Sequence, residues 1–241
     1  MAPLARALAH RFRVLEPLQR RRDDWPLTVD RHVADLAEVA PDSAVLVGSS
    51  WGAMLALSFA SSHPDRVRCV ALVGCGTYSA EGREVYHRTM NERLDAVGRA
   101  RMAELAQHFE EETDRGERDR LLAAAADLSS RAQSVEPMST DWEFASFDAD
   151  GHDETWQDVL RRQEDGREPA AFSAIRVPVL MLHGADDPHP GPITRDVLRP
   201  FLPQLEYIEL EQCGHIPWVE RHARHQFLQI LEAWLLTHGP T

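Results

Sequence analysis

Apolar residues occur along this chain in two kinds of pattern, which predict two kinds of secondary structure. Short apolar segments bounded by turn residues are typical of strands that are buried in a parallel sheet. Five segments are therefore expected to be strands, at residues 12–15, 44–47, 67–73, 179–182 and 206–210. Elsewhere apolar residues recur every three or four positions, as they do on one face of a helix.

Helices are expected at residues 29–39, 52–61 and near 194–199. Thr28 suits the N-cap of the first of these, and Asp30 adds a carboxylate to its first turn. The second helix is apolar all around, which indicates that it is buried. The terminal helices each have one apolar face, formed by Leu4, Leu8 and Phe12 at the start of the chain and by Ala223, Phe227, Ile230, Leu231 and Trp234 at its end.

These elements divide the chain into three blocks. Residues 1–76 and 171–241 alternate strands with helices, an order that implies parallel strands. Residues 77–170 are polar and have helical spacing at Met90, Leu94 and Val97, and again at Leu105 and Phe109. We therefore expect an α/β core with a mostly parallel sheet flanked by helices. The middle block is expected to be an inserted helical cap, or lid, over the carboxyl ends of the strands, where ligands bind in such sheets.

Composition narrows the class of protein. The chain has 241 residues, 43% of them hydrophobic, which is enough for one α/β core. Its formal net charge of −13 argues against nucleic-acid binding, and no apolar run is long enough to cross a membrane. The N-terminus has no apolar leader pattern, and three widely spaced cysteines form neither a disulfide framework nor a zinc pattern. We expect a cytoplasmic protein without metal or cofactor, acting on a small molecule.

The strongest motif is Gly48-Ser49-Ser50-Trp51-Gly52, which matches G-x-S-x-G between a predicted strand and a predicted helix. In this context Ser50 is a candidate nucleophile on a tight turn that exposes its hydroxyl above the sheet. Glycines on both sides are expected to let the backbone turn without Cβ clashes. The backbone N–H of Trp51, at a helix N-terminus, is expected to stabilise a developing oxyanion.

A serine hydroxyl needs a base, and the base in turn needs a carboxylate that orients it. His215 follows a predicted strand and precedes the last helix, so it lies on the same edge of the sheet as Ser50. Asp187, with Asp186 as its close rival, follows residues 179–182 at that edge. The order Ser, Asp, His along the chain is the order of α/β-hydrolases. His183 and His189 lie nearby, but this turn needs no metal to explain it.

These motifs resemble those of the capped α/β-hydrolases, and most of all the members similar to proline iminopeptidase. The resemblance rests on five stretches, Gly48–Gly52, Ala53-Met54-Leu55-Ala56-Leu57, His63-Pro64-Asp65-Arg66-Val67, Pro178–Gly184 with Asp187, and Cys213-Gly214-His215. It covers residues 1–76 and 171–241, and the cap only in position and helical character. In this family the aspartate stands three residues after the glycine that ends the strand, which favours Asp187 over Asp186.

Two departures from the family pattern bear on the site. Family members carry an early strand ending in His-Gly, whose loop supplies the second oxyanion N–H, and the chain begins after the place where that strand would stand. Its loss would leave a central position of the sheet unpaired, so we expect a late start, a different closure of the fold, or weak catalysis. The family's glycine-rich turn is replaced by Gln19-Arg20-Arg21-Arg22-Asp23.

The cap carries the clues to the substrate. Acidic residues cluster between positions 141 and 158, interleaved with aromatic ones and without any Arg or Lys. Such a surface could receive a substrate with a cationic amine, as the resemblance implies, or it could be a solvated charged loop. The candidate substrate-binding residues are Cys75, Thr77, Trp142, Glu143, Glu154 and Trp156.

The predicted function is that of a serine hydrolase, which cleaves an ester or amide of a small substrate through an acyl-enzyme on Ser50. An aminopeptidase of the proline iminopeptidase type is one form of this prediction. Two alternatives remain open. One is a catalytically impaired binding protein on the same scaffold, and the other is a cofactor-free lyase or perhydrolase that uses the same three residues.

Overall fold

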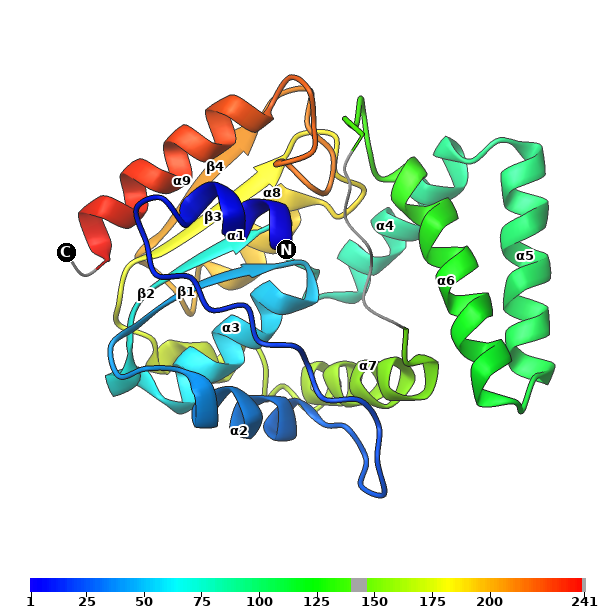
Figure 1. The fold of residues 1–241 in the computed structure, drawn as a ribbon, viewed down its shortest axis with the longest axis horizontal. Helices are drawn as coiled ribbons and strands as arrows, with labels where there is room; N and C mark the ends of the chain where they lie inside the picture. The colour runs from blue at the N-terminus through cyan, green and yellow to red at the C-terminus, as the bar shows by residue number, and fades with distance from the viewer. Residues whose placement is uncertain (140–146, 240–241) are drawn as a thin grey trace.

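The computed structural model describes residues 1–139 and 147–239 of the chain. Four strands form one parallel sheet in the order β1–β2–β3–β4, which is also their order along the chain (Figure 1). The strands are β1 (Ala44–Ser49), β2 (Val67–Val73), β3 (Val179–Gly184) and β4 (Leu205–Leu210). Four of the five predicted strands are thus confirmed to within two residues at each end.

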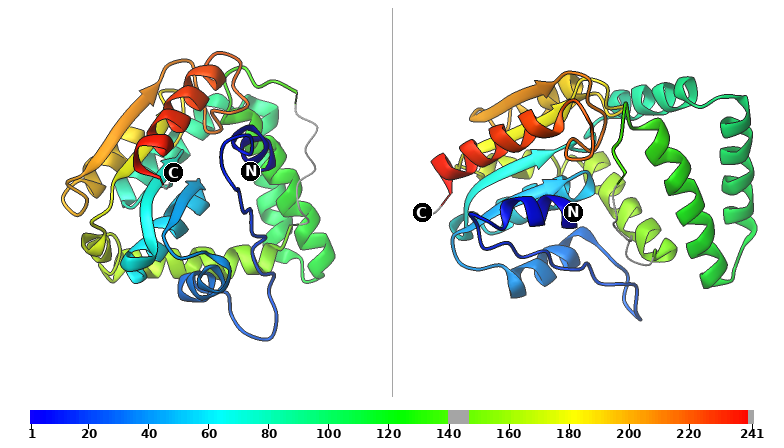
Figure 2. Two further views of the ribbon diagram at one scale, coloured as in Figure 1. Left: turned by 60° about the vertical axis from the view of Figure 1, so that its left-hand side comes forward. Right: turned by 45° about the horizontal axis from the view of Figure 1, so that its top comes forward.

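Helices cover both faces of the sheet, because successive side chains of a buried strand point in opposite directions. Val70 and Leu72 of β2 pack into a core cluster with α2 (Val29–Val39) and α3 (Trp51–Ser62). Cys69, Ala71 and Val73 of the same strand pack into a second cluster with α1 (Ala2–Leu8) and α9 (Arg224–His238). Figures 1 and 2 show the resulting three layers.

The helices of the core begin where their sequences indicate. Thr28 caps α2, and its hydroxyl accepts a hydrogen bond from the Arg31 N–H. Residues Ala53–Ala60 of α3 are buried on every side, as an all-apolar helix requires. The remaining core helices are α8 (Gly191–Leu198) and two short 3₁₀ turns, η1 (Pro64–Arg66) and η2 (Ala170–Ala174).

A helical insertion lies between β2 and β3, as predicted. It consists of α4 (Ala80–Arg93), α5 (Ala96–Glu111), α6 (Arg115–Ala132) and α7 (Ala149–Glu164). Figure 2 shows α4, α5 and α6 standing beside the sheet, whereas α7 runs beneath it next to α2. Met90 and Leu94 form a small core of the insertion, but Val97 is 77% exposed, so its predicted place on an apolar face is wrong.

The predicted strand at residues 12–15 is also wrong. These residues form no strand, and Leu15 is 54% exposed, although Phe12 and Val14 pack against the cluster next to α1. A strand forms only where a neighbouring strand pairs with its backbone. Within the described chain β1 has such a neighbour, β2, on one side only, and residues 12–15 do not reach its free side as a strand.

Among the described residues, no helix combines the length and the apolar character that a bilayer crossing requires.

Candidate active site

The turn from β1 into α3 holds Ser50 in a strained conformation. Its φ of 55° and ψ of −122° lie in a region that residues other than glycine rarely adopt. Gly48 makes the turn possible, because a Cβ there would lie 2.5 Å from the Gly52 carbonyl carbon and 2.7 Å from the Ala53 Cα. Gly52 is different, since a Cβ there would meet no described atom within 4 Å. The expectation that both glycines avoid clashes is therefore correct for Gly48 only.

Ser50 and His215 lie at the same edge of the sheet. The Ser50 N–H donates to the Val73 carbonyl at the end of β2 over 2.9 Å. The next residue, Gly74, has a φ of 53°, and a Cβ on it would lie 3.1 Å from the Nδ1 of His215. The imidazole of His215 thus rests on the backbone that anchors Ser50. Trp51, as the first residue of α3, has no intrahelical acceptor for its N–H.

Asp187 is the carboxylate that meets His215. Its Oδ2 lies 2.8 Å from the His215 Nδ1, and both side chains are buried. Burial alone would raise the pKa of Asp187, but the charges of His215 and His183 and the hydrogen bonds from His189 and His215 hold this pKa well below its usual range. Burial alone would lower the pKa of His215, yet the Asp187 charge and hydrogen bond raise it above 6.5. Asp187 is therefore an ionised hydrogen-bond acceptor.

Asp186 does not take this role. Its side chain is half-buried and makes no described contact with His215, while its N–H donates to the Cys213 carbonyl over 2.9 Å. The spacing rule of the resemblance and the geometry therefore agree on Asp187.

Two further histidines surround the same carboxylate. His183, at the end of β3, places its Nε2 3.2 Å from Asp187 Oδ2, and this Nε2 donates to the His189 carbonyl over 2.8 Å. His189 donates to Asp187 Oδ1 from its backbone N–H over 2.9 Å and from Nδ1 over 3.1 Å. Sequence reasoning assigned neither residue a role. Their place in the sequence could have indicated them, because His183 lies at the end of β3 and His189 lies in the loop that carries Asp187.

Asp187, His189 and His215 form the one group of potential metal ligands found among the described residues. Their ligand atoms all lie within 4.8 Å of one another. Both Nδ1 atoms already point at the carboxylate, so hydrogen bonding between the three side chains accounts for the cluster.

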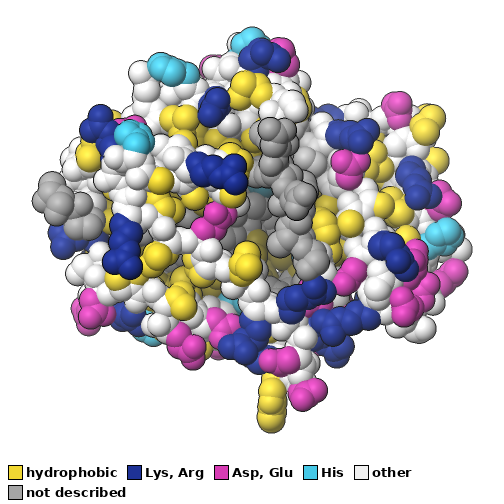
Figure 3. All heavy atoms as spheres, in the orientation of Figure 1, with side chains coloured by type: hydrophobic (Ala, Val, Ile, Leu, Met, Phe, Trp, Pro, Cys, Tyr) yellow, Lys and Arg dark blue, Asp and Glu magenta, His cyan; other side chains and the backbone are white. Residues whose placement is uncertain are grey.

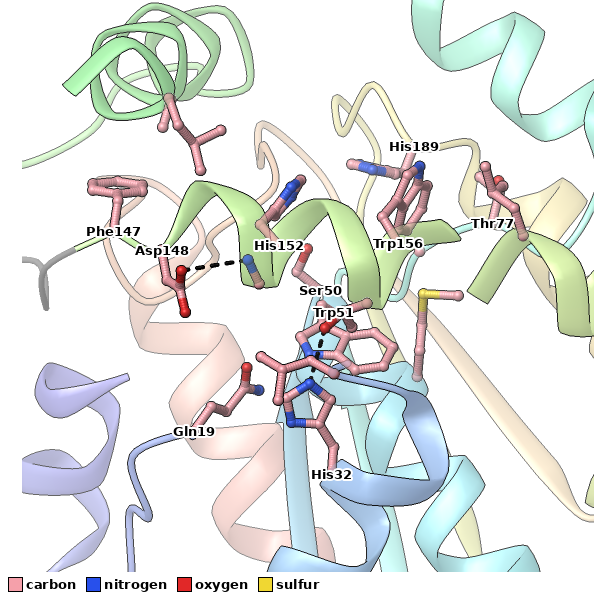
Figure 4. A pocket seen from close by; sticks show the side chains of 18 of the residues that line it. Gln19, His32, Ser50, Trp51, Thr77, Phe147, Asp148, His152, Trp156 and His189 are labelled. Atoms are coloured by element: carbon pink, nitrogen blue, oxygen red, sulfur yellow. Dashed lines mark hydrogen bonds between the residues drawn. The ribbon is translucent and has the colours of Figure 1, made fainter. Parts of the chain in front are cut away.

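A cavity of about 1070 Å³ opens between the sheet edge and the insertion. Ser50, Trp51 and His189 line it, together with Thr77 and Trp156 of the predicted substrate residues. In the view of Figure 4, His32 and Trp51 lie below Ser50, and Trp156 and His189 lie above it. His32 was not predicted; its Nε2 lies 2.9 Å from the Thr155 hydroxyl, which joins α2 to α7.

Two predicted substrate residues do not line this cavity. Cys75 is fully buried away from it, and burial raises the pKa of its thiol to about 12, so it is a small core residue. Glu154 faces the N-terminal segment instead, where it accepts hydrogen bonds from Arg22 Nε and from the Leu27 N–H. Trp142 and Glu143 lie outside the described residues.

The acidic residues of α7 and its N-cap, Asp148, bind the chain from Arg22 to the first residue of α2. Arg22 forms ion pairs with Glu154 and Asp150, and its N–H donates to Asp148. The Val29 N–H donates to the buried Asp158 over 2.8 Å. Figure 3 shows Arg and acidic side chains gathered at the lower junction of the two parts of the molecule. These carboxylates are therefore neither a free amine site nor merely solvated.

The fold and this site together define a class of protein. A strained serine follows a parallel strand and starts a helix, and a buried Asp–His pair lies at the same sheet edge beneath a helical insertion. This is the architecture of α/β-hydrolases.

Comparison with known proteins identifies the family. The family model described as the alpha/beta hydrolase fold matches residues 25–221, so the chain belongs to this family. It is 30% identical over 211 residues to 2-hydroxymuconate semialdehyde hydrolase of Pseudomonas sp., a match that covers 86% of this chain and 66% of that protein. The chain thus spans slightly less than two thirds of the length of this relative.

Solved structures show the same fold at low identity. An esterase from Thermogutta terrifontis superposes with a TM-score of 0.60 at 19% identity, covering 98% of this chain and 86% of that one. Proline iminopeptidase from Mycobacterium smegmatis gives 0.51 at 16% identity, with 87% and 70% covered. Proline iminopeptidase is therefore one of several structural neighbours, and the narrower resemblance to it stays a prediction.

Proposed function

We propose that this chain is a serine hydrolase that cleaves a small acyl substrate through an acyl-enzyme on Ser50. One observation carries the proposal. The strained turn that bears Ser50 and the buried Asp187–His215 pair lie at one sheet edge, and Ser50 lines a large cavity there. A backbone held in so rare a conformation is costly, and such strain is concentrated at functional sites.

The reaction would proceed by acyl transfer. The Ser50 Oγ attacks the substrate carbonyl carbon while His215 takes the hydroxyl proton as general base. The Trp51 N–H stabilises the oxyanion, and His215 returns the proton to the leaving group as it departs. Water then attacks the acyl-enzyme and loses its proton to His215, which returns a proton to the Ser50 Oγ as the bond to the acyl group breaks and the acid leaves. Asp187 orients His215 and stabilises its charged form throughout.

The substrate we propose is an ester or related acyl compound that needs no amine. The aminopeptidase version requires carboxylates that are free to hold a cationic group. Glu154 and Asp148 are instead engaged by Arg22, and Asp148 also by Arg115. The 30% identical relative supports adding 2-hydroxymuconate semialdehyde to any substrate panel.

The test is labelling by a fluorophosphonate probe, read by intact mass and peptide mapping. We expect the parent protein to be labelled on Ser50 and Ser50→Ala to remain unlabelled. Ser49→Ala is the matched control, because it removes the neighbouring hydroxyl of the same turn and is expected to label normally. A panel of p-nitrophenyl esters, proline p-nitroanilide and the semialdehyde then separates esterase from aminopeptidase.

Two results would overturn the proposal. One is labelling that persists in Ser50→Ala. The other is a parent protein that is folded by circular dichroism and yet unreactive, which would favour a non-catalytic binding protein on this scaffold.

A further inference from the structure

His189 stands between the Asp187–His215 pair and the cavity. Its ring stacks on His215 with ring centroids 4.6 Å apart and an interplanar angle of 26°. On its other side Tyr86 of α4 lies against it at 4.3 Å. His189, but not His215, is among the residues that line the cavity, and Figure 4 shows it there with Trp156 and Thr77. This imidazole is therefore exposed to the same cavity as Ser50.

The hydrogen bonds of His189 determine which nitrogen carries the proton. Asp187 is ionised and can only accept, so the Nδ1 that lies 3.1 Å from its Oδ1 must be the N–H of the ring. In the neutral ring, Nε2 is then a bare acceptor. Burial lowers the pKa of His189, more than the Asp187 hydrogen bond raises it, so the neutral form prevails at neutral pH.

The acceptor on His189 is unused by the protein. Nε2 has no hydrogen-bond partner anywhere in the part of the chain that the structure describes, whereas Nδ1, the backbone N–H and the carbonyl of the same residue are all bonded. The stack between Tyr86 and His215 and the bond to Asp187 fix the ring plane. The side chain keeps 18% of its surface exposed, at the cavity wall.

We infer that His189 is a substrate-contacting residue, whose Nε2 accepts a hydrogen bond from a hydroxyl or N–H group on the acyl part of the substrate. This inference rests on the proposed acyl transfer at Ser50 and adds a substrate class to it, namely acyl compounds that carry a hydrogen-bond donor close to the scissile carbonyl. Asp187 then orients two imidazoles. His215 takes the proton of Ser50, and His189 binds the substrate.

The experiment compares p-nitrophenyl butyrate with its 2-hydroxy and 3-hydroxy analogues. In the parent protein, we expect kcat/KM for one hydroxy ester to exceed that for the butyrate by about tenfold, the effect of one hydrogen bond in a partly buried site. The two variants are His189→Asn and His189→Phe. The asparagine amide can keep the bond to Asp187 but offers nothing at the position of Nε2. Phenylalanine keeps the stacking between Tyr86 and His215 but neither nitrogen.

Both variants are expected to lose the preference for the hydroxy ester. In His189→Asn, kcat/KM for the hydroxy ester is expected to fall about tenfold further than kcat/KM for the plain butyrate, because only the hydroxy ester loses a hydrogen bond to Nε2. The low-field proton resonance of the His215 Nδ1–H, which reports the bond to Asp187, is expected at the same position in the parent and in His189→Asn.

Three outcomes overturn the inference. The first is an equal fall in kcat/KM for all the esters in His189→Asn, together with a shifted His215 resonance. This result would make His189 a positioning residue only. The second is an unchanged hydroxy preference in both variants, and the third is a parent without any hydroxy preference. These outcomes can be distinguished from failure of the proposed function. In that case the parent protein itself would neither react with the fluorophosphonate nor hydrolyse any ester.

Discussion

At the scale of single residues, the site depends on one buried carboxylate. Asp187 accepts hydrogen bonds from two imidazoles and from a backbone N–H, and these partners keep it ionised in spite of its burial. An ionised Asp187 in turn favours the protonated form of His215 and raises its pKa above the usual range. A general base must be neutral to take a proton, so the charge that orients His215 also sets the lower pH limit of the reaction.

We therefore predict the pH dependence of ester hydrolysis. Since the pKa of His215 is raised, kcat/KM of the parent is expected to rise with pH through a midpoint higher than that of an ordinary histidine. Asp187→Asn removes the charge that raises this pKa, so the midpoint moves to lower pH while the plateau falls by roughly 10⁴-fold. Asp186→Asn is the control, and it is expected to keep the midpoint and the plateau of the parent. An unshifted midpoint in Asp187→Asn would contradict this account.

At the scale of elements, the junction of β1 and α3 is built on close approach of backbone to backbone. Only at Gly48 does the α3 backbone leave no room for a Cβ, while Gly52 faces open space within the described structure. The nucleophile turn thus depends on the first glycine of its motif for steric reasons, and the second must be explained by something other than crowding.

This asymmetry predicts opposite results for two matching substitutions. Gly48→Ala forces a Cβ against the backbone of Gly52 and Ala53, neither of which can move without disturbing α3. We expect it to lower the free energy of unfolding by roughly 3 kcal/mol, or to prevent folding. Gly52→Ala is expected to change it by less than about 1 kcal/mol, with a tendency to stabilise, because alanine favours a helix. Urea unfolding measures both, and equal losses would refute the asymmetry.

At the scale of the whole molecule, the insertion is tied to the loop that carries His215. The His215 N–H donates to the carbonyl of Gln133, just beyond α6, over 2.9 Å. The fully buried Glu220 accepts from the N–H groups of Val135, Glu136 and Gly214, over 3.0, 2.9 and 3.2 Å. The segment of the insertion that follows α6 and the loop that carries His215 therefore share one buried carboxylate and are expected to move together.

Removing this carboxylate tests the coupling. Glu220→Ala leaves three N–H groups without their acceptor at a buried position, which is expected to cost roughly 3 kcal/mol or more of the free energy of unfolding. Amide hydrogen exchange at Val135 and Gly214 is expected to accelerate more than exchange in β2 or β3. The control is Glu211→Gln, which alters an exposed carboxylate close to the same loop. Equal exchange rates in Glu220→Ala and the parent would show that the two segments are held independently.

Much of the fold followed from local pattern. Apolar segments and turn residues predicted β1 to β4, and Thr28 predicted the start of α2, because a buried parallel strand and a helix cap both leave their mark on neighbouring residues. Chain order also indicated which side chains share the carboxyl edge of the sheet. Ser50, Asp187 and His215 were therefore placed at one edge before any contact between them was known.

Other features depend on residues far apart in sequence, and only the tertiary structure decided them. Residues 12–15 have a strand's composition but no strand beside them, and a backbone without a partner does not pair. The carboxylates of α7 suggested a substrate site until Arg22, over a hundred positions away, proved to bind them. The position of His189 over His215 arises from packing between the loop after β3, the loop that carries His215, and α4. These segments are far apart in the sequence, so no local pattern could predict this contact.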